Sequence, residues 1–275
     1  MTTGTIAAPT LTGAPHSDNV LHRARWAASD TLTITKRNLL ALTRIPEALV
    51  FGIIQPIMFV LLFRYVFGGA IQTEGTSYVN YLMPGIFVQT VCFGAVSTSI
   101  GLAEDLQKGL IERFRALPMA RSAVLAGRTT ADLIRNVLVV AIMTAVGFLV
   151  DFRPTTGVLA YLAGILLILL FAYSLSWGFA VIGLSAANSE TAQVISFPLL
   201  FPLTFASSAF VPVADMPSWL QGFATYQPVS VTVTACRALM LGGPTAIWVF
   251  QSLAWTLGFL VLMVPFAVHK YRTRT

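Results

Sequence analysis

Long apolar runs alternate with short polar or basic segments along the whole chain. Six runs approach or reach the roughly 20 residues that a helix needs to cross a bilayer: 49–70, 81–102, 131–150, 158–184, 191–210 and 246–268. The third is apolar only from Val137 and reaches full length by starting near Ala131, with Arg135 extending to the interface. The pattern predicts an all-α polytopic membrane protein with six transmembrane helices.

Two segments outside these runs are amphipathic or apolar but too short to cross. Residues 21–45 mix Trp26 and several leucines with arginine and lysine, which suits a helix lying in the membrane interface until Pro46 ends it. A solvated helix is the alternative. Residues 211–245 are largely apolar and broken by prolines, which favours short re-entrant helices in the outer leaflet over a compact exposed loop.

The composition supports a membrane environment. Hydrophobic residues make up 56% of the chain and charged residues 10%, where a soluble domain has roughly a quarter charged residues. The net charge is +6, and the cations gather before the first run, between the second and third, and after the last. Only Arg64, Arg153 and Arg237 fall on or toward the other side, so the positive-inside rule places both termini in the cytoplasm of a cell-membrane protein. This placement does not fit a nucleic-acid surface.

The domain organisation follows from the same pattern. Residues 1–20 are rich in Thr, Ala, Pro and Gly and are expected to form a disordered cytoplasmic tail. Residues 21–275 form a single transmembrane domain.

Several kinds of chemistry are missing from the sequence. The three lysines, Lys36, Lys108 and Lys270, do not follow a glycine, so no GxxxxGK[ST] phosphate-binding loop is present. No protease motif or metal spacing occurs, and the six runs lack the carboxylates that ion-coupled carriers place at membrane depth. We therefore expect no enzyme activity and no cofactor in this chain, and energy supplied from another polypeptide. A secondary carrier is the alternative to such an arrangement.

One basic segment could receive that energy. Leu106, Leu110, Phe114 and Leu117 recur at helical spacing between charged residues, and Pro118 ends the helix. A short amphipathic helix just below the membrane can dock in a groove of a soluble partner, although a charged loop that only sets topology has the same composition.

Three blocks of residues carry a further signal. The first block runs Asp105-(x3)-Gly109-(x2)-Glu112-Arg113-Phe114-Arg115-Ala116-Leu117-Pro118-Met119, followed by Arg121, Leu125-Ala126-Gly127-Arg128 and Ala131-Asp132. The second runs Ala209-Phe210-Val211-Pro212, Met216-Pro217-Ser218-Trp219-Leu220-Gln221, Pro228-Val229-Ser230 and Ala235-Cys236-Arg237-Ala238-Leu239. The third is Tyr65-Val66-Phe67-Gly68-Gly69, which closes the first run. Together they resemble the ABC-2 type permeases, most closely those of the daunorubicin-exporter kind. One departure is Gln227, which stands where many members of that family have Asn and bears on the helix cap at this turn.

The resemblance implies roles for these segments. Residues 21–45 would be a connecting helix, and residues 104–117 a coupling helix seated on a separate ATP-binding subunit, which would hold ATP and Mg. A second permease copy or a homologous permease would complete the transporter within membrane lipid. The coupling residues would be Glu104, Asp105, Lys108, Gly109, Glu112, Arg113, Phe114, Arg115, Leu117 and Pro118. The outer re-entrant residues would be Met216, Pro217, Trp219, Leu220, Pro228 and Arg237.

The second and fifth runs of such permeases face the substrate path. Candidate contacts there are Gln89, Thr90, Phe93, Ser97, Phe197, Phe201, Thr204 and Phe205, with ordinary helix packing as the alternative. Arg64 extends to headgroups or pairs with Glu74 or an acidic substrate group. An acid-free apolar path suits a hydrophobic or amphipathic drug, antibiotic or lipid-like molecule. Export of a polysaccharide or glycoconjugate is the second reading, and a membrane protein without transport is the third.

Overall fold

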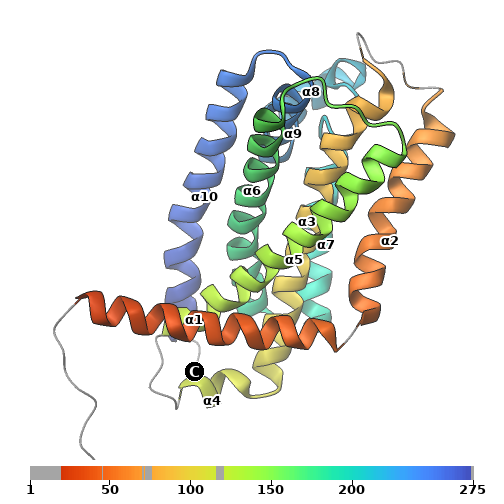
Figure 1. The fold of residues 1–275 in the computed structure, drawn as a ribbon. Helices are drawn as coiled ribbons and strands as arrows, with labels where there is room; N and C mark the ends of the chain where they lie inside the picture. The colour runs from red at the N-terminus through yellow and green to blue at the C-terminus, as the bar shows by residue number, and fades with distance from the viewer. Residues whose placement is uncertain (1–19, 45, 70, 72–75, 116–120, 274–275) are drawn as a thin grey trace, which may run out of the picture.

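The described part of the chain is helical throughout and contains no strand. The computed structural model describes residues 20–44, 46–69, 71, 76–115 and 121–273, so the predicted tail lies outside the described residues. The helices, shown in Figure 1, are α1 (Val20–Thr43), α2 (Pro46–Leu62), α3 (Tyr78–Gln107), α4 (Leu110–Arg115), α5 (Arg121–Leu149), α6 (Val158–Ser185), α7 (Ser189–Phe205), α8 (Ser218–Tyr226), α9 (Pro228–Leu241) and α10 (Thr245–Thr273). A π-helical turn at Phe63–Phe67 extends α2, and a 3-10 turn at Val213–Asp215 precedes α8.

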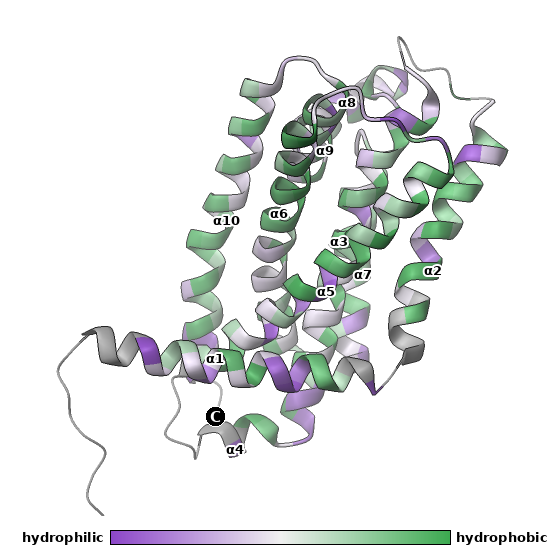
Figure 2. Ribbon diagram, in the orientation of Figure 1, coloured by the Kyte–Doolittle hydropathy of each residue, from purple (hydrophilic) through white to green (hydrophobic). Residues whose placement is uncertain are grey.

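Four of these helices are long and apolar enough to cross a membrane: α3, α5, α6 and α10. Helix α2 with its π-helical turn covers residues 46–67, which at about 1.5 Å per residue also matches a hydrocarbon core of roughly 30 Å. Large apolar side chains such as Leu159 and Val261 are exposed on the outside of the bundle, and Figure 2 shows apolar residues along its outer helices. An apolar surface of this size would be unfavourable in contact with water, whereas it is stable in contact with lipid.

The helix ends differ from the sequence-based boundaries at several runs: α3 and α10 each continue five residues past the predicted end, and the differences at α5 and α7 have a structural reason. Helix α5 begins at Arg121, ten residues before the predicted start, and Arg135 turns into the bundle instead of reaching the interface. Helix α7 ends at Phe205, and residues 206–210 form a turn that closes against the end of the bundle. Hydrophobicity alone missed both boundaries, because polar residues on α5 are paired internally and apolar residues after α7 are buried in a turn.

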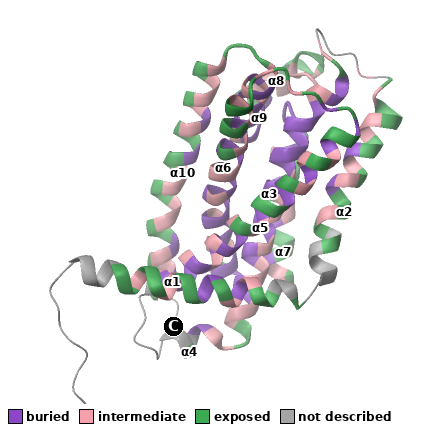
Figure 3. Cartoon of the chain, in the orientation of Figure 1, coloured by how far each residue is buried: buried purple, intermediate pink, exposed green. Residues whose placement is uncertain are grey.

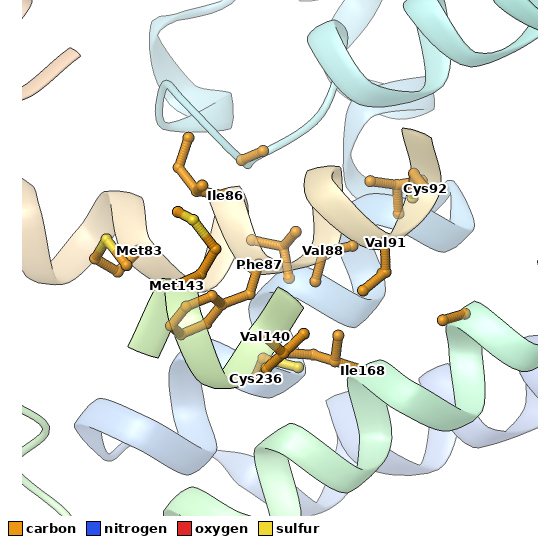
Figure 4. Packing of buried hydrophobic residues seen from close by; sticks show 14 of the residues in the cluster. Met83, Ile86, Phe87, Val88, Val91, Cys92, Val140, Met143, Ile168 and Cys236 are labelled. Carbon is orange, nitrogen blue, oxygen red and sulfur yellow. The ribbon is translucent and has the colours of Figure 1, made fainter. Parts of the chain in front are cut away.

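Helix α3 is the centre of the core. Figure 3 shows it buried along most of its length, with α5, α6, α7 and α9 packed around it. In the close view of Figure 4, Phe87 and Val88 of α3 gather with Val140 and Met143 of α5, Ile168 of α6 and Cys236 of α9. Buried residues lie on all sides of α3, as expected of a helix at the centre of a bundle.

Polar side chains define where several helices begin. Ser77 accepts a hydrogen bond from the Asn80 amide at the start of α3, and Asn188 accepts one from the Thr191 amide at the start of α7. Gln227 caps α9: its side-chain oxygen accepts from the Val229 amide at 2.9 Å, ahead of Pro228 at the first helical position. A glutamine therefore serves as the cap of α9.

Helix α1 lies across one end of the bundle, which we call the α1 end (Figure 1). Ile34, Thr35 and Asn38 are buried against α5, and the Thr35 hydroxyl donates to the Gly127 carbonyl at 3.2 Å. A Cβ at Gly127 would lie 2.6 Å from the Ile34 Cβ, so this glycine allows the two helices to touch. Trp26 is exposed on the opposite face, as expected of an interfacial helix.

Helices α8 and α9 sit at the other end of the bundle, the α8 end, and differ in burial (Figure 3). Helix α9 is packed against α3, α6 and α10, and its inner residues are almost fully buried. Helix α8 is largely exposed, with Trp219 80% exposed. Of these two short helices, only α9 is therefore buried against the bundle.

Candidate functional site

The predicted coupling segment falls on the last turn of α3 and on α4, at the α1 end. Glu104 and Asp105 close α3, and Gly109 turns the chain in a left-handed conformation, φ +65°, that a residue with a side chain rarely adopts. Ile111 anchors α4 because it is buried in a cluster with α5, α6 and α10. Arg113 is exposed. The side chains of Glu112, Phe114 and Arg115, and all of Leu117 and Pro118, lie outside the described residues.

Five charged side chains meet beside this segment, and we call them the inner charge cluster: Arg37 of α1, Asp105 of α3, and Arg128, Asp132 and Arg135 of α5. Arg37 donates to Asp105 at 2.8 Å, and Arg128 lies 3.8 Å from both Asp105 and Asp132. Arg135 lies 3.7 Å from Asp132, whose side chain is only 4% exposed and accepts from the Thr98 hydroxyl at 2.5 Å. Three arginines and two aspartates leave this cluster with one net positive charge.

Glycines on α3 make room for the arginines of the cluster. The Arg128 guanidinium donates to the Ser97 carbonyl at 3.0 Å, and a Cβ at Gly101 would lie 1.7 Å from its Nη2. The Arg135 guanidinium donates to the Gly94 carbonyl at 2.6 Å and to the Ser97 hydroxyl at 2.7 Å. A side chain at Gly101 would displace the Arg128 guanidinium, whereas one at Gly94 would meet the Asn136 side-chain oxygen at 2.7 Å and the Arg135 Nη2 at 3.3 Å.

Two adjoining cavities lie beside the cluster. The larger, of about 490 Å³, is bordered by α1, α3, α5 and α7 and has Asp105, Asp132 and Phe197 in its wall. The smaller, of about 110 Å³, lies between α2, α3 and α5. Gln55, Phe93 and Ser97 border both cavities, so the two are neighbours.

Most of the predicted path residues border these cavities or a row of aromatic rings. Gln89, Thr90, Phe93 and Ser97 line the small cavity. Phe93 of α3 contacts Phe197 and Phe201 of α7, and the row continues toward the α8 end with ring centroids 4.7–6.1 Å apart. We call this row the phenylalanine ladder: Phe93, Phe197, Phe201, Phe205, Phe210, Phe63, Phe59 and Phe67. Thr204 does not join it, because it is fully buried and its hydroxyl donates to the Leu200 carbonyl.

One of the predicted outer residues, Arg237, is held by contacts with two other elements at the α8 end. Arg237 of α9 donates to the carbonyls of Tyr81 at 3.0 Å and Ser208 at 2.8 Å, and its guanidinium carbon lies 3.6 Å from the Tyr81 ring centroid. We call this contact the Arg237 latch, because it joins α9, the start of α3 and the turn after α7. The other outer residues support the turn: Pro217 precedes α8, Pro228 begins α9, Leu220 is half-buried, and Met216 offers its carbonyl to Gln221 at 2.8 Å.

Sequence reasoning missed the inner charge cluster as a unit. Its signal was the spacing of Arg128, Asp132 and Arg135 at i, i+4 and i+7, which places the three on one face of a helix. Asn136 and Gln55 were missed as well, since single amides in apolar runs carry no distinctive pattern. Arg64 lies in the π-helical turn, 6.0 Å from the Tyr65 ring, and its predicted partner Glu74 lies outside the described residues.

The described part of the chain is an apolar helical bundle with a charged cavity at one end and a row of aromatic rings toward the other, and these features define a helical membrane protein. Comparison with known families gives the class: residues 29–241 match the ABC-2 type transporter family, and the chain belongs to it. It is 34% identical over 249 residues to the daunorubicin resistance ABC transporter permease protein DrrB1 of Streptomyces coeruleorubidus, covering 90% of this chain and 88% of that protein. It is 27% identical over 266 residues to the probable doxorubicin resistance ABC transporter permease protein DrrC of Mycobacterium tuberculosis, covering 96% and 95%. A putative transport permease, ycf38 of Cyanophora paradoxa, is 26% identical over 239 residues, covering 86% and 81%.

Proposed function

We propose that this chain is the membrane-spanning subunit of an ATP-driven exporter of hydrophobic or amphipathic molecules, and that a separate ATPase supplies the energy. The observation that carries this proposal is the position of Asp105. It lies one turn before α4, on the long central helix α3, and pairs with Arg37 of α1 and Arg128 of α5. A push on α4 would therefore reach three helices at once, and α3 also borders both cavities.

The proposed topology has six spans in a single domain, residues 21–275, preceded by a cytoplasmic tail. Helix α2 with its π-helical turn and the proline-containing α7 would add two spans to the four long ones. Lys36, Lys108 and Lys270 all belong to the α1 end, which supports a cytoplasmic location of that end in the cell membrane. Helix α1 would lie in the cytoplasmic interface, and α8 and α9 would re-enter the outer leaflet.

The proposed mechanism is alternating access. The partner ATPase would bind ATP and Mg and seat the coupling residues of α4, and this chain would work with a second permease subunit. Closure of the ATPases would move α4, and the inner charge cluster would carry the movement to α1 and α5. Substrate would leave along the phenylalanine ladder when the Arg237 latch opens. Net export requires that the inward and outward states bind the substrate with different affinity.

The test is co-purification of the tagged chain with the ATPase encoded beside it. Arg113 and Arg115 are changed together to Glu, and the matched control is Arg153→Glu, an exposed arginine between α5 and α6 at the opposite end. The proposal expects ATPase retention by the wild type and the control and loss of most of it by the double variant. Equal retention by all three would move the interface elsewhere, and no retention by the wild type would reject the proposed subunit role.

A further inference from the structure

The small cavity contains polar groups that the fold does not satisfy. Gln89 of α3 is 3% exposed, and neither its amide nitrogen nor its oxygen has a hydrogen-bond partner among the described residues. Asn136 of α5 is also 3% exposed, and its amide nitrogen lacks a partner there. Both side chains line the same cavity, whose volume is about 110 Å³.

Two unpaired amides at one buried place are costly. Burial of a polar group without a partner lowers stability, so leucines at both positions would give a more stable fold if the cavity bound nothing. The cavity is open to polar occupants, because Ser97 and the Arg135 guanidinium also border it. Unpaired groups that persist at such a site point to a ligand that pairs with them.

The donors of the site define the chemistry of that ligand. The amide nitrogens of Gln89 and Asn136 are donors, and the adjacent Arg135 adds positive potential. An occupant should therefore offer acceptor oxygens, such as carbonyl, ether or hydroxyl groups, and a hydroxyl could also donate to the Gln89 oxygen. Phe59 and Phe93 complete the wall with aromatic faces that suit an apolar body.

The volume limits what can enter. A cavity of about 150 Å³ holds a benzene ring, so the small cavity accommodates a polar substituent and not a whole drug molecule. The neighbouring cavity of about 490 Å³ is large enough for more of the molecule. We infer that the small cavity is a polar subsite, formed within one permease chain by Gln89, Asn136 and Arg135, that takes the oxygen-bearing end of an amphipathic substrate.

This inference rests on the proposed export function, and the experiment separates the two. Purified full-length chain in lipid nanodiscs is titrated with doxorubicin, an amphipathic aromatic molecule rich in carbonyl and hydroxyl oxygens, and binding is followed by the fluorescence of the drug. The double variant Gln89→Leu with Asn136→Leu removes both amides and puts apolar side chains in their place. Gln251→Leu is the matched control, because Gln251 of α10 also has a buried amide oxygen without a partner among the described residues and borders neither cavity.

The subsite predicts that the double variant binds doxorubicin about tenfold more weakly, the effect of one or two lost hydrogen bonds. Its unfolding midpoint should stay equal to that of the wild type or rise, because two unpaired buried amides have been removed. Gln251→Leu should bind doxorubicin like the wild type. A purely structural role of the amides would instead lower the unfolding midpoint of the double variant.

Three results would overturn the inference. The first is equal doxorubicin binding by the wild type and the double variant, as expected of a cavity that holds only water. The second is lower stability of the double variant with unchanged affinity, and the third is no doxorubicin binding by the wild type. Retention of the ATPase is scored separately on the same preparations. A chain that retains the ATPase but shows any of these results keeps its proposed function and loses the subsite.

Discussion

The two ends of the bundle hold their buried and partly buried arginines in different ways, apart from the exposed Arg153–Asp151 pair at the α8 end. At the α1 end, three arginines share two aspartates at 2.8–3.8 Å, and the groups belong to three helices. At the α8 end, Arg237 faces two backbone carbonyls and the Tyr81 ring, with no ion pair to a carboxylate within the described residues. One end is a network of exchangeable partners, and the other is a single fixed contact.

The difference indicates how each end can move. The Arg128–Asp105 pair, at 3.8 Å, joins α5 to α3 over more than the length of a direct hydrogen bond, so it can shorten or lengthen as the two helices slide. The pairs of Asp132 with Arg128 and Arg135 lie within α5 and move with that helix. The Arg237 latch depends on two carbonyl positions and a ring plane, so it is either made or broken. In the proposed orientation, the network faces the ATPase and the latch closes the exit.

The largest effect is expected from Asp132, which pairs with two arginines of the cluster. Asp132→Asn keeps the shape and an acceptor for Thr98 but leaves Arg128 and Arg135 with less compensation, and we expect a loss of about 3 kcal/mol in unfolding free energy. Thermal unfolding of purified protein measures it. The control is Asp151→Asn at the opposite end. The exposed carboxylate of Asp151 pairs with Arg153, and its loss should lower the unfolding free energy by less than about 0.5 kcal/mol. Equal effects of the two changes would contradict the importance of the cluster.

Two glycines of α3 test whether the two ends of the bundle differ in how well they tolerate an added side chain. A Cβ at Gly85 would lie 2.2 Å from the Ala209 carbonyl oxygen, which belongs to backbone, so Gly85→Ala should cost about 2 kcal/mol. A Cβ at Gly101 would meet the flexible end of Arg128, which can move aside. The gain of nearly 1 kcal/mol from replacing a helical glycine offsets part of that strain, so Gly101→Ala should change stability little. Similar losses at both sites would show that the α1 end is as rigid as the α8 end.

Apolar periodicity predicted the helical class well, because lipid requires long apolar runs and closed backbone hydrogen bonds. It failed where polar residues pair inside the bundle. Arg135 was expected at the interface, yet it donates to the Gly94 carbonyl, and α5 consequently continues ten residues further back. Of the path residues, Phe93, Phe197 and Phe201 come together, whereas Thr204 faces its own helix. Which face of a helix points inward depends on long-range contacts that a single sequence does not contain.

A conservative change of the latch should have an intermediate effect. Lysine retains the charge of Arg237 but cannot contact both carbonyls while stacking on Tyr81, so Arg237→Lys should cost about 1 kcal/mol of unfolding free energy. Thermal unfolding measures the loss, and Arg153→Lys at the same end is the control, since Arg153 is exposed. If the Arg237→Lys variant were as stable as the wild type, the positive charge alone, and not the planar guanidinium group, would account for the stability of the Arg237 latch.

The smallest effect on stability is expected from Lys108, although it belongs to the proposed coupling segment. Its ammonium lies 3.2 Å from the Glu104 carboxylate, but the two side chains are 64% and 45% exposed, and solvent screens such a pair. Lys108→Ala should therefore change the unfolding free energy by less than about 0.5 kcal/mol. Arg37→Ala should cost about 1 kcal/mol, because Arg37 joins α1 to the largely buried Asp105 at 2.8 Å. If Lys108 contacts the ATPase, the Lys108→Ala variant should retain less ATPase in co-purification at moderate salt, while its thermal unfolding stays unchanged. A Lys108 variant with lower stability but unchanged ATPase retention would assign this lysine to the fold of the α1 end instead of to the partner.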